Sequence, residues 1–192
     1  PETTIRVNTL KTTRDELKKM FDLKEIDSRL GELPDAIIVK HLSNFDDSLY
    51  LVQDDAAQLA VLKLDPRENE IVLDACSSPG GKTTYISQLM NNTGRIDAWD
   101  IHEHRVELVK KLAQKLGATN INATCTDATN YNTLLRDKYD RVLLDVPCSG
   151  LGVIRKKPDI KWTRREEDLK ELVEIQSKIL ECGAEYLKTG TS

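Results

Sequence analysis

The chain has 192 residues, of which 39% are hydrophobic and 31% are charged, a balance typical of folded globular proteins that excludes a disordered chain. Its 28 Lys and Arg residues against 32 Asp and Glu residues give a formal net charge of −4, so binding to nucleic acid requires a local basic patch. No apolar stretch of the sequence approaches membrane-spanning length, and its four cysteines show no metal-ligand spacing, which favours reduced thiols in a cytoplasmic protein without a metal site.

Residues 1–52 predict a small α+β unit, which we expect to be an RNA-binding accessory subdomain. Its predicted elements are a strand in TIRVN, an amphipathic helix in TRDELKKMF, and strands in AIIVK and LYLV. Residues 53–64 (QDDAAQLAVLKL) predict a linking helix with Asp54 or Asp55 as its N-cap.

Residues 65–192 alternate between strand and helix patterns. Strands are predicted at 71–75, 95–100, 121–124 and 139–145, and helices at about 82–91, 103–116 and 165–187. This alternation is typical of a Rossmann-like α/β fold, in which right-handed crossovers build a parallel sheet.

The stretch CSSPGGKTT, residues 76–84, joins the first of these strands to a helix. It resembles half of a phosphate-binding loop, which needs a glycine, four arbitrary residues and then Gly-Lys-Ser/Thr. Cys76 stands where the first glycine should be, and the preceding Asp74 would repel a triphosphate. Gly80 and Gly81 alone are equally consistent with an ordinary strand-to-helix turn.

Carboxylates follow all four predicted strands, and ligands of such sheets bind at the carboxyl ends of the strands. Each Asp alone could be a helix or turn cap, but four at successive strand ends indicate a site: Asp74, Asp100, Asp127 and Asp145.

Asp100 lies 19 residues after Gly81, where a carboxylate can accept both hydroxyl protons of a ribose diol. The helix N-terminus behind the glycines offers N–H groups to an anion. S-adenosylmethionine combines these features, although Lys82 could simply pair with a neighbouring acid. His102 and His104 are assigned to a solvated helix start.

The stretch RVLLDVPCSGLGVIRKKPDIKW, residues 141–162, combines a strand-end acid with a cysteine and a basic segment. Cys148 could be an inert buried thiol, but its position after Asp145 favours a role at the substrate. The basic segment can hold RNA phosphates while Trp162 stacks on a base; its candidate contacts are Arg155, Lys156, Lys157, Lys161 and Trp162.

Four stretches together closely resemble the Sun (Fmu, RsmB) family of bacterial RNA cytosine-5 methyltransferases: VLDACSSPGGKTTYISQLM, AWDIHEHRVELVKKLAQKLGATNI, TDATN and YDRVLLDVPCSGLGVIRKKPDIKW. RVNTLKT and LPDAI extend the resemblance into the N-terminal unit, and RKKPDIKW points to the branch acting on 16S ribosomal RNA. The family more often has two alanines where Ser77 and Ser78 stand.

The resemblance implies a monomeric enzyme that binds S-adenosylmethionine and makes 5-methylcytosine in 16S ribosomal RNA. The implied cofactor-binding residues are Cys76, Ser77, Ser78, Pro79, Gly80, Gly81, Lys82, Asp100, Asp127 and Asp145.

The implied chemistry starts from a cysteine thiolate that adds to C6 of cytosine and so makes C5 nucleophilic. Asp145 hydrogen-bonds N3 or the exocyclic amine, and Cys148 assists release of the product. The attacking cysteine is expected at the end of a further strand beyond Ser192. We therefore expect the chain to be a fragment, with its sheet incomplete at the C-terminal strands, that binds cofactor and transfers no methyl group.

Two alternatives remain open at this point. A phosphate-loop nucleotide hydrolase would use GKTT and the strand RVLLD, and a non-catalytic RNA-binding module would use only the N-terminal unit and the basic segment. Neither needs an acid at each strand end.

Overall fold

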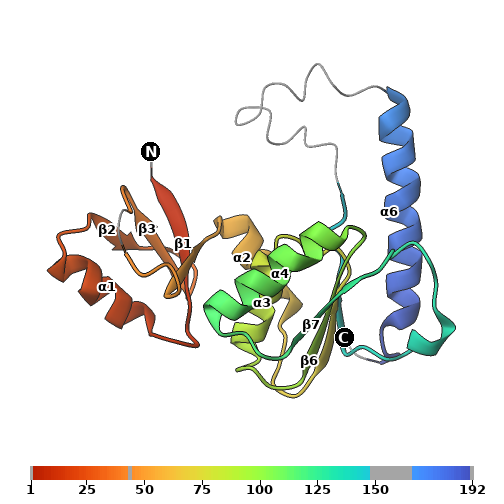
Figure 1. Cartoon of the computed structure of the whole chain (residues 1–192), viewed down its shortest axis with the longest axis horizontal. Coiled ribbons are helices and arrows are strands. Elements are labelled where there is room, and N and C mark those ends of the chain that lie inside the picture. The colour runs from red at the N-terminus through yellow and green to blue at the C-terminus, as the bar shows by residue number, and fades with distance from the viewer. Residues whose placement is uncertain (1, 43–44, 148–165, 191–192) are drawn as a thin grey trace.

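The computed structural model describes residues 2–42, 45–147 and 166–190. Figure 1 shows a small N-terminal sheet with one helix on one side of the molecule and a larger sheet in the middle, with α6 beyond it. The two four-stranded sheets have the orders β2-β3-β1-β4 and β7-β6-β5-β8.

The N-terminal unit is an antiparallel sheet covered by one helix. Leu17 and Phe21 of its helix are fully buried against the sheet, and Thr13 begins that helix with a capping box to Glu16. Its elements are β1 (Thr3–Val7), α1 (Arg14–Leu23), β2 (Ser28–Leu30), β3 (Ala36–Val39) and β4 (Tyr50–Val52).

The strand β2 was not expected from the sequence. It has only three residues, and two of them are exposed, so it lacks the apolar alternation that identifies a strand. It exists because its backbone pairs with β3.

Residues 55–147, with α6, form the second unit, and every strand pair of its sheet is parallel. Asp54 caps the first helix through the amide of Ala57, as one of the two expected caps. The elements are α2 (Asp55–Leu64), β5 (Ile71–Asp74), α3 (Gly81–Leu89), β6 (Arg95–Asp100), α4 (Glu103–Leu116), β7 (Ile121–Cys125), the 3-10 helix η1 (Thr133–Leu135), β8 (Arg141–Leu143) and α6 (Glu166–Tyr186).

Helices cover both faces of this sheet, which confirms the predicted Rossmann-like architecture. Because side chains alternate along a strand, Val72 of β5 packs with α2 and α3, whereas its neighbour Leu73 packs with Ile179 of α6. Among the described residues, no helix has the length and apolar character needed to cross a membrane.

The strand β8 is shorter than the predicted 139–145. It pairs with β5 at three positions, from Val72 opposite Arg141 to Asp74 opposite Leu143, and β5 itself ends at Asp74. Tyr139 forms only an isolated bridge with Leu187. Asp145 consequently lies two residues beyond the strand, on the loop above the sheet.

A buried carboxylate joins β6 and β7 to the segment that precedes β8. Asp97 is 2% exposed, and its Oδ2 accepts a 2.9 Å hydrogen bond from the hydroxyl of Tyr139. Its Oδ1 accepts hydrogen bonds from Arg95 and Asn122. A carboxylate at this depth is stable only with such partners.

Replacing Tyr139 with Phe should therefore destabilise the fold. The change leaves Asp97 Oδ2 without its donor, so urea unfolding should show a loss of about 1–3 kcal/mol in the free energy of unfolding. Tyr131→Phe, at a tyrosine that is 44% exposed, is the matched control and should stay close to wild type. Equal unfolding midpoints for the two variants would contradict the role given to the Asp97 network.

Candidate functional site

The four strand-end acids lie along one edge of the sheet, as the sequence predicts. Parallel strands end at the same edge, and Asp74 and Asp100 are the last residues of β5 and β6. Asp127 and Asp145 each follow β7 and β8 by two residues.

Backbone amides in the turn before α3 are already hydrogen-bonded to carbonyl groups of the protein. The N–H of Ser77 donates to Trp99 O at 2.8 Å, and the N–H of Gly80 donates to Ser77 O at 2.7 Å, while Pro79 has no N–H. Gly80 has φ +103°, and a Cβ there would lie 3.2 Å from Val109 Cα, so the turn requires glycine at this position. Ser77, Pro79 and Gly80 therefore offer no row of free amides to a triphosphate. This disfavours the phosphate-loop alternative.

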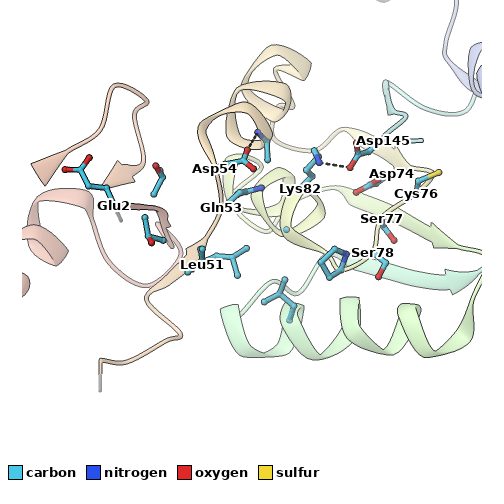
Figure 2. Close-up of a pocket in the computed structure, with 17 residues that line it drawn as sticks. Glu2, Leu51, Gln53, Asp54, Asp74, Cys76, Ser77, Ser78, Lys82 and Asp145 are labelled. Atoms are coloured by element: carbon cyan, nitrogen blue, oxygen red, sulfur yellow. Dashed lines mark hydrogen bonds and ion pairs between the residues drawn. The ribbon is translucent and has the colours of Figure 1, made fainter. Parts of the chain in front are cut away.

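An ion pair connects this turn to the loop after β8. The Nζ of Lys82 lies 2.6 Å from Oδ2 of Asp145 (Figure 2). The Asp145 side chain is 52% exposed and the Lys82 side chain 23%, so the pair contributes little to stability, about 0–1 kcal/mol. Its main effect is to hold the two polar groups together.

Two cavities lie next to Asp145, and Cys76, Ser78 and Asp145 line both. We call them the sheet-edge cavity, of 610 Å³, and the inter-unit cavity, of 630 Å³. Each is within the range of about 300–1,000 Å³ that is usual for small-molecule sites.

The sheet-edge cavity contains three of the four strand-end acids: Asp100, Asp127 and Asp145. Oδ1 of Asp100 accepts the amide of His102 at 3.0 Å, and the nearest cation to its Oδ2 is Arg105 at 3.9 Å. The Asp100 carboxylate therefore binds the backbone just before α4 with one oxygen and keeps acceptor capacity on the other.

Asp127 also serves the local backbone. Its Oδ1 accepts from the amide and hydroxyl of Thr129 at 2.9 and 2.7 Å, and its Oδ2 accepts from Asn130. Asp127 therefore does act as a turn cap. A carboxylate held in this way is oriented for a ligand without having to reorganise.

The inter-unit cavity is lined from the N-terminal unit by Glu2 and Leu51 and from the second unit by Asp74 and Lys82, and Gln53 and Asp54 lie between Glu2 and Lys82 in Figure 2. Among the described residues that line it, the acids Glu2, Asp54, Asp74 and Asp145 face one cation, Lys82. This excess of carboxylates disfavours a phosphate and suits a ligand edge that donates N–H groups.

Asp74 is the most deeply buried of these acids, at 1% exposed. Its Oδ2 accepts the hydroxyl of Thr83 at 2.7 Å, and its Oδ1 has no hydrogen-bond partner among the described residues. Burial is the main cause that raises the pKa of Asp74 to about 6, against the lowering effect of the Thr83 hydrogen bond.

The three described cysteines have raised pKa values. Burial, followed by Asp74, raises the pKa of Cys76 to about 12, and desolvation raises those of Cys125 and Cys182. Because a thiolate is the reactive form, these three are poor nucleophiles at neutral pH. The described part of the chain also holds no group of His, Cys, Asp and Glu arranged for a metal ion.

Several predicted site residues lie outside the described residues. They are Cys148, Arg155, Lys156, Lys157, Lys161 and Trp162.

The predicted cofactor residues divide between the two cavities. Ser77, Pro79, Gly81 and Lys82 line only the inter-unit cavity, and Gly80 lines neither. The sequence prediction did not include several residues of the sheet-edge cavity, among them Ile101, His102, Ile175 and Ile179.

The sequence contained part of the information needed to predict these four residues. Ile101 and His102 directly follow Asp100, so their position was available from the sequence. The spacing of Ile175 and Ile179 places both on one helix face, but only the packing of α6 shows that this face reaches the cavity.

An open parallel sheet with helices on both faces and cavities at its carboxyl edge defines the Rossmann-like fold of methyltransferases. The crystal structure of PH0851 has this fold, with a TM-score of 0.90 and 32% identity over 98% of this chain and 44% of that one. A methyltransferase homolog protein from Pyrococcus horikoshii matches with a TM-score of 0.84 and 31% identity, covering 99% of this chain and 62% of that one.

The chain belongs to the 16S rRNA methyltransferase RsmB/F family, whose family model matches residues 61–192. The resemblance seen in the sequence is therefore confirmed. A relative from Bacillus subtilis (strain 168), described as a probable ribosomal RNA small subunit methyltransferase B, is 39% identical over 99% of this chain and 44% of its own length. The chain thus spans a little under half of that relative.

The buried Asp74 predicts a pH-dependent stability difference. Its pKa of about 6 lies above the ordinary value of 3.8, so the folded state binds this proton more tightly than the unfolded chain. Stability from the protonated group is fully present below about pH 4 and is lost as the pH rises through about 6. Relative to wild type, Asp74→Asn should gain about 2–3 kcal/mol in the free energy of unfolding between these limits.

Urea unfolding at about pH 4 and about pH 7.5 measures this difference. Glu107, whose pKa is lowered by Lys110, provides the control, because Glu107→Gln should show a small change of opposite sign. A pH-independent difference between Asp74→Asn and wild type would contradict the assignment.

Proposed function

We propose that this chain carries the cofactor site of an S-adenosylmethionine-dependent enzyme that forms 5-methylcytosine in 16S ribosomal RNA. The observation that supports this most strongly is the presence of Asp100, Asp127 and Asp145 in one cavity at the carboxyl edge of the sheet. Membership of the RsmB/F family and the name of the Bacillus subtilis relative support the reaction and the RNA class.

The sheet-edge cavity fits the proposed cofactor chemically. Asp100 would accept the ribose hydroxyls with the acceptor capacity that His102 leaves unused. Asp127, held by Thr129, would accept an N–H group of the adenine. When bound, the cofactor supplies an electrophilic methyl group.

The inter-unit cavity would receive the target base. Cytosine presents an exocyclic amine, so an acidic lining suits its edge, and Asp145 would hydrogen-bond N3 or that amine. Lys82 keeps this carboxylate in place at 2.6 Å. The base must leave its stack to reach such a cavity, and Cys148, outside the described residues, would assist release of the product.

The remaining assignments follow from the same proposal. Residues 1–52 would form an accessory subdomain that takes part in RNA binding, residues 53–64 the link, and residues 65–192 the catalytic domain. The basic residues of the segment 155–161 and Trp162 would contact the RNA. We propose a monomer that acts in the cytoplasm.

Substitution of Asp100 should weaken cofactor binding. Loss of one charge-assisted hydrogen bond typically costs about 1.5–3 kcal/mol, so Asp100→Ala should raise the dissociation constant for S-adenosylmethionine at least about tenfold. Isothermal calorimetry measures this. Glu107→Ala, on α4 and outside both cavities, should bind like wild type, and unchanged affinity in Asp100→Ala would refute the ribose assignment.

Methyl transfer by the full-length protein tests the proposed reaction. With labelled cofactor and 16S RNA, the label should appear on C5 of a cytosine, and Asp145→Asn should lower kcat by at least about a hundredfold, because it loses a positioned charge at the base. Cofactor affinity of this variant should change less than that of Asp100→Ala. Label on another atom, or on no RNA, would contradict the proposed function.

A further inference from the structure

One buried arginine links the N-terminal unit to the helix that begins at the site. Ile5 and Val7 of β1 face α1, so the alternating Arg6 faces the opposite side of its sheet, toward α3. Its side chain is 1% exposed. Burial lowers the pKa of Arg6 to about 10, so the guanidinium is still charged at neutral pH.

The guanidinium binds the first turn of α3. Its Nη1 donates to Gly81 O at 2.6 Å and to Gln53 Oε1 at 2.6 Å, and its Nη2 donates to Thr84 Oγ1 at 3.0 Å. The guanidinium carbon also lies 4.7 Å from the centroid of the Tyr85 ring.

Burying the Arg6 guanidinium has a larger desolvation cost than a contact that only joins two units requires. Among the described residues, Arg6 donates to uncharged oxygens of Gln53, Gly81 and Thr84, and its Nε has no partner. The positive end of the α3 dipole also lies at this turn. Apolar packing usually provides docking with less desolvation, so the directed hydrogen bonds are the distinctive contribution of Arg6.

The same helix turn carries site residues on its other side. The N-terminal unit contacts positions 81, 84, 85 and 88, which share one helix face; Asp35 accepts from Tyr85 and Gln88 there. Lys82 and Thr83 point elsewhere, to Asp145 and Asp74.

We propose that Arg6 is a positioning residue: its fork of hydrogen bonds fixes the first turn of α3, and thereby holds Lys82 at Asp145 and Thr83 at Asp74. Because Asp145 lines the sheet-edge cavity as well as the inter-unit cavity, the N-terminal unit would then support one side of the proposed cofactor site. The effect on cofactor binding rests on the proposed function, whereas the effect on the helix turn does not.

Arg6→Lys tests this proposal, because lysine keeps the charge and most of the length but loses the planar fork. Two measurements are made: hydrogen exchange of the α3 amides without cofactor, and the affinity for S-adenosylhomocysteine. Exchange at Thr84 and Tyr85 should rise at least about tenfold, as expected for loss of one charge-assisted hydrogen bond. The affinity should fall because Asp145, which Lys82 holds, lines the sheet-edge cavity. Thr84→Ala, which removes one acceptor, is a milder variant that should show smaller changes of the same sign.

Asn8→Ala is the matched control. Asn8 is 2% exposed and also joins the units, through a 2.8 Å hydrogen bond to Leu116 O at the far end of α4. It should lower the melting temperature without changing α3 exchange or affinity.

Two results would overturn the proposal: wild-type exchange in Arg6→Lys, or equal exchange increases in Arg6→Lys and Asn8→Ala. A wild-type protein that does not bind S-adenosylhomocysteine would refute the proposed function, and the exchange data would still decide the role of Arg6.

Discussion

The parallel pairing of β5 with β6 and β8 is the constraint on which the site depends. Because all three strands run in one direction, Asp74, Asp100 and Asp145 come to the same edge although they are far apart in the chain. The turn that follows β5 then needs Gly80, since α4 passes 3.2 Å from the position of its absent Cβ. Sheet direction and this close approach together place the first turn of α3 at the inter-unit cavity.

The helix α3 is shared between the two units, and its burial on almost all sides explains its unusual composition. Three of its buried polar residues find partners in different neighbours: Thr83 in Asp74, Thr84 in its own turn and Arg6, and Tyr85 in Asp35. An amphipathic surface helix would leave such groups to water. In this chain they connect the N-terminal sheet to the carboxyl edge of the larger sheet.

The sequence was sufficient for the features that arise from local patterns. The alternation of strands and helices and the acid after each strand required only periodicity and turn chemistry. Other features depend on contacts that no local pattern records. Arg6 reaches Gly81 across 75 positions, β2 is a strand only through its pairing, and the division of CSSPGGK between two cavities results from the position of the N-terminal unit. The resemblance to a family identified the residues of CSSPGGK as one group. It could not show which cavity each of them lines.

A crystal structure with bound S-adenosylhomocysteine tests the central claim most directly, which is that the carboxyl edge of the sheet is a cofactor site. The account predicts the ligand in the sheet-edge cavity, with the ribose hydroxyls within hydrogen-bonding distance of the Asp100 carboxylate, about 2.5–3.0 Å, and the adenine beside Asp127. Binding in the inter-unit cavity, with Asp100 free of the ribose, would contradict it.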